Sequence, residues 1–243
     1  MNREASAPSH VRYVQDGLDY RKFIAQFAQR SNCQSYFEIG VNRGRSLAGV
    51  DAAAIGVDPD MKLAFDVLGQ KPMVLLYQMT SDDFFASHDL TALFGRAVDM
   101  AFLDGMHTFE FLLRDFINTE RHCHGGSAIF LHDCFPVNAE MTERQRNTQA
   151  RQDRELRSYW TGDVWKLIPI LKAYRPELSI TCSNCSPTGL AIVRGLDPGS
   201  TVLADNAAKI IEAFMPQVMT DENIAAYYEA NQFVPPESVL EAL

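Results

Sequence analysis

The stretch that most constrains the fold runs from residue 36 to residue 58. An apolar run leads into a turn bounded by Gly40 and Gly44, a helix starts at Ser46, and a second apolar run ends in Asp58. The glycines allow the backbone to approach a ligand closely, and the amides that begin a helix suit a negative group. Asp58 lies 18 residues after Gly40, near the spacing of about 20 at which an acid binds a ribose in dinucleotide sites. The stretch therefore predicts a strand, turn, helix and strand that bind a nucleoside.

Apolar runs and helical patterns alternate along most of the chain, which predicts a Rossmann-like, doubly wound α/β fold with a mostly parallel sheet. Gly125 and Gly126 are expected to end the long helix before the fifth strand. Seven strands are expected near residues 36–39, 52–57, 73–79, 98–103, 128–131, 178–182 and 190–193. The main helices are expected near residues 18–30, 61–69, 109–123 and 164–171.

The length of 243 residues and a hydrophobic fraction of 47% suit one large domain. We expect a flexible N-terminal arm over residues 1–16, the main domain over 17–199 and a helical C-terminal extension over 200–243. That extension packs either on the domain or on a second copy of the chain.

The net charge of −9 argues against a nucleic-acid partner. The lack of a membrane-spanning run or a signal peptide predicts a cytoplasmic protein without a membrane partner.

The first turn reads E-I-G-x-x-x-G-x-S and the second strand ends in V-D-P. In this order the motifs resemble those of the class I S-adenosylmethionine-dependent methyltransferases. That resemblance implies S-adenosyl-L-methionine as the cofactor and a last sheet strand that inserts antiparallel. It covers roughly residues 34–195.

The resemblance also implies a position for each part of the cofactor. The first turn would bind the methionine part, Asp58 the ribose, and Ser81 with Asp82 the adenine amino group. Asp82 is equally explained as an acid at a helix N-terminus. Glu38 is a carboxylate inside an apolar strand, so a partner must compensate its burial, either the cofactor amino group or amides of the turn. The implied cofactor-binding residues are Glu38, Gly40, Asn42, Arg43, Gly44, Ser46, Asp58, Ser81, Asp82 and Asp104.

A second group of polar residues follows the fourth and fifth predicted strands. The fourth strand ends in the motif D-G-x-H, Asp104 to His107, and the fifth ends in His132 and Asp133. This arrangement resembles the small-molecule O-methyltransferase branch, methyltransferase 24-like, whose members carry a divalent metal. The resemblance implies His107 as general base, with Asp104 also catalytic and Asp104 and Asp133 as metal ligands.

His132 departs from that branch, in which an acid is expected at its position. As a third ligand it would favour Mn²⁺ or Fe²⁺ over Mg²⁺, because a hard cation prefers oxygen. Alternatively, His132 is a strand-end histidine that bonds to backbone, and the metal is absent. The candidate metal set is therefore Asp104, His132 and Asp133.

An arginine-rich stretch without an apolar stripe follows the fifth strand, over residues 136–159. It is either a substrate-binding lid whose guanidinium groups hold an anion, or a solvated loop.

The five cysteines include the pair Cys182 and Cys185 in a C-x-x-C spacing, but no second pair completes a zinc site. They are expected to be reduced thiols.

These observations favour an S-adenosylmethionine-dependent methyltransferase that O-methylates a small hydroxylated acceptor, a sugar or a natural product. A nucleotide-dependent oxidoreductase is the first alternative, because the same kind of sheet binds dinucleotides. A cofactor-binding scaffold that has lost turnover is the second.

Overall fold

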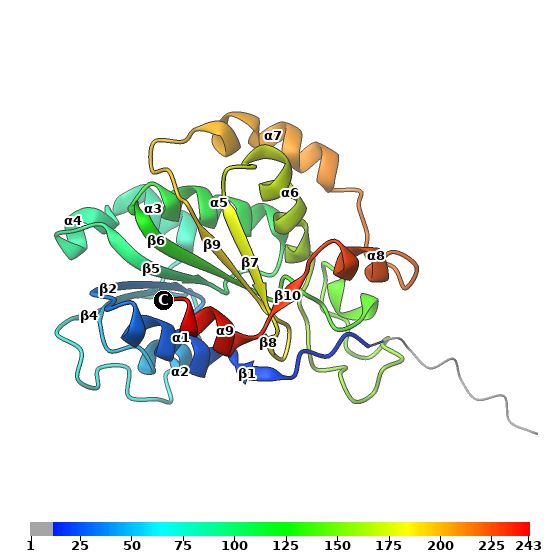
Figure 1. Ribbon diagram of the computed structural model, residues 1–243, viewed down its shortest axis with the longest axis horizontal. Helices are drawn as coiled ribbons and strands as arrows, with labels where there is room; N and C mark the ends of the chain where they lie inside the picture. Colours follow the sequence, from blue (N-terminus) through cyan, green and yellow to red (C-terminus); the bar gives the residue numbers. More distant parts are fainter. Residues whose placement is uncertain (1–11) are drawn as a thin grey trace, which may run out of the picture.

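The structure is a computed structural model that describes residues 12–243, and its helices cover both faces of a central sheet (Figure 1). The strands are β1 Gly17–Asp19, β2 Ser35–Ile39, β3 Ala53–Val57, β4 Val74–Tyr77, β5 Val98–Leu103, β6 Cys123–His132, β7 Ser179–Ser183, β8 Cys185–Ser186, β9 Leu190–Arg194 and β10 Phe233–Val234. The helices are α1 Tyr20–Arg30, α2 Arg45–Ala48, α3 Ser81–Ser87, α4 Leu90–Phe94, α5 Phe109–Glu120, α6 Leu167–Tyr174, α7 Val202–Phe214, α8 Ile224–Glu229 and α9 Pro236–Glu241, with short 3-10 turns η1 Ala139–Thr142 and η2 Val164–Lys166.

The main sheet has the strand order β10-β7-β9-β6-β5-β2-β3-β4. Strand β9 is antiparallel to both of its neighbours, and every other pairing in this sheet is parallel. The prediction of a doubly wound, mostly parallel sheet with one antiparallel last strand is therefore confirmed. Strands β1 and β8 form a separate two-stranded sheet.

The strand count differs from the seven expected, because the sheet has eight strands. The eighth is β10 at the edge, where Phe233 and Val234 pair with Cys182 and Ser183 of β7. Two residues between helices are too short to show an alternating pattern. The C-terminal extension thus adds a strand as well as helices to the fold.

The sheet has a separate hydrophobic core on each face, which explains why its strands read as continuous apolar runs. On one face, Phe37, Ile55, Ala101 and Leu131 pack with helices α5, α6 and α7. On the other face, alternate strand residues pack with α1, α2 and α9, as the ribbon in Figure 1 shows. Side chains from neighbouring positions therefore point to opposite layers.

Two local predictions are wrong. Residues 61–69 form an irregular loop, not a helix, because the amides of Lys62 and Ala64 bond to the carbonyls of Asn42 and Arg43 across the chain. The glycine pair at 125–126 lies inside β6 and does not end α5, which stops at Glu120. In both cases contacts distant in sequence decided the local structure.

Residues 12–16 of the expected N-terminal arm lie against the C-terminal extension, and residues 1–11 are outside the described part of the chain. Tyr13 stacks on Tyr228, with ring centroids 4.3 Å apart. The hydroxyl of Tyr228 donates to the Pro136 carbonyl at 3.1 Å, and that of Tyr227 to the Cys134 carbonyl at 2.8 Å. We call this contact the tyrosine clasp, and it binds the backbone directly after β6.

Within residues 12–243, no helix combines the length and apolar character that crossing a bilayer requires. The five cysteines are free thiols and all are buried, as expected.

Candidate active site

A cavity of about 700 Å³ opens at the carboxyl ends of the central strands. Its volume is in the range of small-molecule sites, and its position is where ligands bind in open α/β sheets. Most of the predicted site residues line it, so the separate motifs do converge. The lining residues that bear on the chemistry are Tyr20, Arg21, Gly40, Asn42, Arg43, Arg45, Ser46, Asp58, Phe65, Ser81, Asp82, Asp104, Met106, His107, Phe111 and Asp133.

The glycine turn lies between β2 and α2. Gly40 has a φ of +90°, and a Cβ there would lie 2.0 Å from the Asp104 carbonyl oxygen. Gly44 has a φ of +77°, and its Cβ would meet the Val67 side chain at 2.5 Å. Only glycine fits both positions. The turn can therefore lie directly against the end of β5, which brings Asp104 next to it.

Asp58, at the end of β3, is held by two backbone amides. Its Oδ2 accepts from the Asn42 amide at 2.7 Å, and its Oδ1 accepts from the Asp60 amide at 2.7 Å. A carboxylate oxygen can accept a second hydrogen bond, so both oxygens remain able to accept from the two hydroxyls of a ribose. The turn and Asp58 thus form one rigid wall.

Glu38 lies beneath the cavity and does not line it. Its carboxyl group is fully buried and accepts from the Tyr36 hydroxyl at 2.7 Å and the Ser46 hydroxyl at 2.6 Å. These hydroxyls, and not the turn amides expected from the sequence, satisfy it. Burial raises the pKa of Glu38 to about 8, although both hydroxyls oppose the shift. Any action of Glu38 on a cofactor would pass through Ser46, which does line the cavity.

The raised pKa of Glu38 predicts a pH-dependent stability. Between the unfolded value of 4.5 and the folded value of about 8 the native state holds a proton that the unfolded chain has lost. The free energy of unfolding should therefore fall as the pH rises through this window, by about 1.4 kcal/mol per pH unit. Urea titrations of wild type and Glu38→Gln from pH 5 to pH 8 would test this. An identical pH slope in both proteins would contradict it.

Asp82 lies at the start of α3, where it was expected, and forms an ion pair with Arg114 of α5. Arg114 Nε and Nη2 lie 2.9 and 2.7 Å from its two oxygens. This pair lowers the pKa of Asp82. Asp82 is an acid in a first helical turn, as one reading predicted, and it also lines the cavity next to Ser81. Its contact with the adenine amino group stays a prediction.

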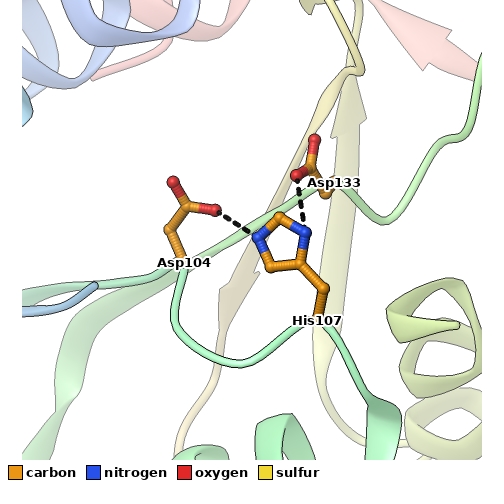
Figure 2. A group of neighbouring side chains, drawn as sticks. All are labelled: Asp104, His107 and Asp133. Carbon is orange, nitrogen blue, oxygen red and sulfur yellow. Dashed lines mark ion pairs between the residues drawn. The ribbon is translucent and has the colours of Figure 1, made fainter. Parts of the chain in front are cut away.

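Asp104, His107 and Asp133 form a group whose donor atoms all lie within 4.8 Å of one another. Figure 2 shows the His107 ring between the two carboxylates. His107 Nε2 lies 3.6 Å from Asp104 Oδ1, and Nδ1 lies 3.5 Å from Asp133 Oδ2. All three residues line the cavity.

The two carboxylates hold a proton on His107. Burial by itself would lower the pKa of His107, but its bond to Asp104 and the charge of Asp133 outweigh burial and raise the pKa to about 9. Conversely, burial opposes ionisation of Asp104, but the nearby histidines hold its pKa well below its usual range. At neutral pH the group is therefore an imidazolium between two carboxylates.

His132, the third candidate metal ligand, approaches the same group from the buried side. Its Nδ1 lies 3.0 Å from Asp104 Oδ1, and its ring packs against the tilted Tyr20 ring with centroids 4.0 Å apart. It does not line the cavity, whereas His107 does. The structure therefore places His107, and not His132, with the two aspartates on the cavity wall, and the partner of His132 is a carboxylate and not backbone.

Asp133 has an unusual backbone conformation, with a φ of +57°. Non-glycine residues rarely adopt this region of φ, and a residue stays in it only where contacts with neighbouring groups fix its backbone. The buried Thr188 hydroxyl donates to Asp133 Oδ1 at 2.7 Å. Thr188 belongs to the turn before β9, so the antiparallel strand orients a residue of the site.

The segment after β6, residues 136–163, covers the D-G-x-H loop, and we call it the cover segment. The Trp160 carbonyl accepts from His107 Nδ1 at 2.7 Å, and the Trp160 ring stacks on His107. This bond assigns the Nδ1 proton and leaves Nε2 facing Asp104. The Asp163 side chain accepts from the Phe109 amide at 2.9 Å and so caps α5.

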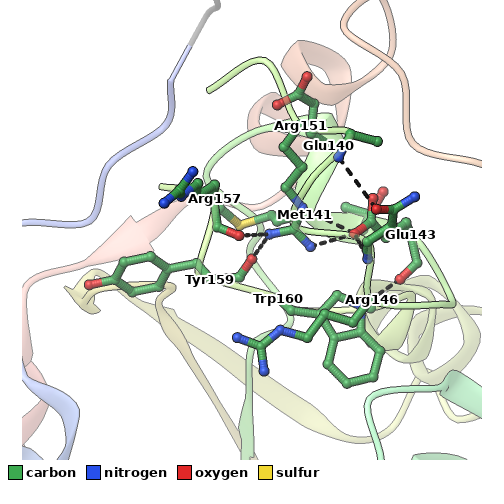
Figure 3. A network of polar contacts seen from close by, with 12 residues as sticks. Glu140, Met141, Glu143, Arg146, Arg151, Arg157, Tyr159 and Trp160 are labelled. Carbon is green, nitrogen blue, oxygen red and sulfur yellow. Dashed lines mark hydrogen bonds and ion pairs between the residues drawn. The ribbon is translucent and has the colours of Figure 1, made fainter. Parts of the chain in front are cut away.

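The arginines of the cover segment are mostly structural. Arg151 is buried and donates to Glu143 at 2.7 Å and to the carbonyls of Arg157 and Tyr159 (Figure 3). The Trp160 indole donates to the Glu143 carbonyl at 2.6 Å. The segment is therefore an internally bonded structure with Arg151 at its centre, and the solvated-loop interpretation does not describe it.

Replacing Arg151 with methionine is expected to raise amide hydrogen exchange in residues 143–160 by about 10- to 100-fold, because buried acceptors lose their donor. Arg154→Met is the matched control, since Arg154 is exposed and has no polar partner among residues 12–243. Hydrogen-exchange mass spectrometry measures both. Equal exchange in the two variants would show that Arg151 does not hold the segment.

Several site residues were missed from the sequence, among them Tyr20, Arg21, Trp160 and Thr188. Tyr20 and Arg21 begin α1, and both line the cavity. Trp160 and Thr188 reach the site from 53 and 55 residues beyond the groups that they contact. No motif marks them, because their role depends on how the chain folds back on itself.

Comparison with known proteins agrees with this geometry. Residues 37–134 match the sequence profile of a family described as a methyltransferase domain. No protein among the curated sequences that were compared matches the chain.

Solved structures share the fold at low identity. The O-methyltransferase TomG from Streptomyces achromogenes, in complex with S-adenosylmethionine, is 14% identical over 73% of this chain and 80% of its own, with a TM-score of 0.54. The O-methyltransferase from Bacillus cereus, in complex with S-adenosylhomocysteine, is 13% identical over 72% and 79%, with a TM-score of 0.50. The methyltransferase PaMTH1 from Podospora anserina is 12% identical over 73% and 78%, with a TM-score of 0.50.

The profile match covers residues 37–134 and includes the glycine turn, Asp58, the D-G-x-H motif and Asp133. That stretch is therefore similar to a methyltransferase domain, and the fold of the chain is that of solved S-adenosylmethionine- and S-adenosylhomocysteine-bound methyltransferases. The recognition made from the sequence motifs is confirmed.

Proposed function

We propose that this enzyme transfers the methyl group of S-adenosylmethionine to a hydroxyl of a small molecule, a sugar or a natural product. The observation that carries the proposal is the group of Asp104, His107 and Asp133 on the wall of the same cavity as the glycine turn and Asp58. The cofactor would lie along the turn, Asp58 and Ser81, and the acceptor hydroxyl would approach the group.

The reaction needs an aligned oxygen nucleophile and a base. The acceptor oxygen forms a bond to the methyl carbon as the carbon–sulfur bond breaks. The electron pair of the carbon–sulfur bond stays on sulfur. The hydroxyl proton passes to His107 Nε2, which faces Asp104 and is the ring nitrogen that the Trp160 carbonyl does not bond. Asp104 and Asp133 stabilise the imidazolium that results.

The group also fits a divalent metal ion. Asp104 and Asp133 would hold it through their carboxylate oxygens, which suit Mg²⁺, Mn²⁺ or Fe²⁺, and His107 beside them would remain free to act as the base. Such an ion would lower the pKa of the acceptor hydroxyl and hold it in place. The raised pKa of His107 supports assistance of this kind, because an imidazolium cannot accept a proton until the carboxylates beside it are neutralised.

This reasoning predicts how chelation should change the pH profile. In chelated enzyme the rate should rise with pH towards about 9, because the folded pKa of His107 is raised and only its neutral form accepts a proton. Adding Mn²⁺ should move this limb to lower pH. Steady-state rates from pH 6 to pH 10 provide the measurement. A profile that chelator and Mn²⁺ leave unchanged would argue against metal assistance.

The decisive test of the cofactor is calorimetric titration with S-adenosylmethionine and, separately, with NADH, before and after chelation. Micromolar binding of the sulfonium compound alone would support the proposal. The oxidoreductase alternative requires binding of NADH, and the family match disfavours it. The scaffold alternative requires an inaccessible His107, yet that side chain is 20% exposed and lines the cavity.

A further inference from the structure

We propose that the methyl acceptor carries an anionic group, a carboxylate or a phosphate, and that Arg21 binds it. The inference rests on the proposed methyl transfer and names the chemistry of the acceptor. It follows from the charges on the cavity wall, from the hydrogen-bond donors that Arg21 leaves free, and from the position of Arg21 beside the Asp104 group.

The acids of the cavity wall already have partners. Asp58 accepts two backbone amides, and Asp82 is paired with Arg114. Asp104 and Asp133 each lie within 3.6 Å of histidine nitrogens. Their charges are therefore compensated from within the protein.

The arginines of the same wall are not compensated in this way. Arg43 and Arg45 are exposed and form no ion pair with any residue in the range 12–243, and Arg45 lies 5.8 Å from the Phe65 ring centroid. Arg21 is paired only with Asp19. A chain of net charge −9 thus leaves three guanidinium groups facing its main cavity. Such a concentration of positive charge suits anionic ligands.

The cofactor accounts for part of this charge. Its methionine part carries one carboxylate, and in the proposed function it lies against the glycine turn. Arg43 belongs to that turn and Arg45 begins α2 directly after it. These two arginines are therefore at the cofactor end of the cavity, and Arg21 is left for a second anion.

A series of contacts places Arg21 beside the Asp104 group. Its guanidinium carbon lies 4.2 Å from the Tyr20 ring centroid. The Tyr20 ring packs against His132 with centroids 4.0 Å apart, and His132 Nδ1 lies 3.0 Å from Asp104. Tyr20 and Arg21 line the same cavity as Asp104 and His107. An acceptor whose hydroxyl reaches Asp104 and His107 can therefore extend along this wall and bring an anionic group to Arg21.

The bond to Asp19 does not saturate Arg21. One Nη1 donor lies 3.1 Å from Asp19 Oδ2, and the two side chains are 30% and 36% exposed. A pair as exposed as this contributes little, because water screens both charges. The other guanidinium donors have no acceptor among the described residues, and a carboxylate or phosphate can engage two of them at once.

The test compares charged and neutral members of matched probe pairs for binding to full-length protein saturated with S-adenosylhomocysteine. The carboxylate pairs are protocatechuate with its amide and glucuronate with glucose, and the phosphate pair is glycerol phosphate with glycerol. Isothermal titration calorimetry measures each dissociation constant. In at least one pair the charged member should bind about 10- to 100-fold tighter than the neutral member. This is the gain in affinity that charge-assisted hydrogen bonds contribute. Which pair responds distinguishes a carboxylate from a phosphate.

The variants show whether Arg21 provides the preference. Arg21→Gln should abolish the preference for the charged probe. Arg21→Lys should retain part of that preference, because lysine keeps the positive charge but lacks the paired N–H donors of the guanidinium group. Both should bind S-adenosylhomocysteine as wild type does. The control is Arg121→Gln, an exposed arginine at the far end of α5, which should keep the full preference.

Three results would overturn the inference. They are equal affinity for both members of every pair, no binding of any probe, and a preference that Arg21→Gln retains. In each of these cases normal binding of S-adenosylhomocysteine leaves the proposed methyl transfer standing. Failure to bind S-adenosylhomocysteine at all would overturn the proposed function together with the inference.

Discussion

Replacing His107 with glutamine is expected to lower the rate of methyl transfer by about 10²- to 10⁴-fold, the usual contribution of a positioned base. Glutamine keeps a side chain of similar length but cannot accept the hydroxyl proton. The measurement is turnover of an acceptor found by screening, with S-adenosylhomocysteine affinity measured in parallel. That affinity should change by less than about twofold, because an interaction made only in the transition state affects kcat and not ground-state binding.

The matched control is His124→Gln. His124 is 46% exposed and pairs with Asp99 at the opposite end of β6 and β5 from the cavity. It should retain wild-type turnover. If the His107→Gln variant methylated the acceptor as fast as the His124→Gln variant, His107 would not be the base, and another residue of the cavity wall would have to accept the proton.

Replacing Glu120 with glutamine is expected to destabilise the fold by about 3 kcal/mol, the lower end of the cost of breaking a buried ion pair, because Arg175 keeps only its pair with the 55% exposed Glu177. Glu120 Oε2 and Oε1 accept from Arg175 Nη1 and Nη2 at 2.7 and 3.0 Å, and the two side chains are 4% and 1% exposed. The Asp197 amide also donates to Oε1. The pair therefore connects the ends of α5 and α6 with the backbone after β9. Urea unfolding followed by circular dichroism measures the loss.

Lys62→Met provides the comparison, because the Lys62–Asp60 pair is 68% and 72% exposed. Its urea midpoint should match that of wild type, since exposed pairs contribute little. Removing both buried charges together, in Glu120→Leu with Arg175→Met, should restore part of the lost stability. A double variant less stable than Glu120→Gln would show that the pair contributes more than the burial of its charges costs.

The parts of the site that the sequence predicted are those built from local signals. The spacing from Gly40 to Asp58 reflects one strand, turn, helix and strand unit, and the structure confirms that unit. Asp104, His107 and Asp133 follow apolar runs directly, so their position at strand ends could be inferred from the chain. Parallel strands then bring those ends to one edge.

The parts that were missed depend on contacts distant in sequence. Glu38 was expected to pair with amides of the turn, but the hydroxyls of Tyr36 and Ser46 reach it first. The loop at 61–69 has a composition that suits a helix, yet its amides bond to the glycine turn. His132 could not be separated from His107 as a cavity residue, because that distinction depends on which face of the strand end packs on Tyr20.

The tyrosine clasp has a consequence for how this protein can change over time. The methyltransferase profile ends at residue 134, and Tyr227 and Tyr228 bind the chain at Cys134 and Pro136, directly at that boundary. The matched stretch contains the glycine turn, Asp58 and Asp133, whereas Tyr13 and α8 hold the start of the cover segment from outside that stretch. Mutations in α8, or in the few residues around Tyr13, can therefore shift the cover segment without touching the glycine turn or Asp58. The shape of the cavity beside the D-G-x-H loop can thus vary while the turn and Asp58 stay the same.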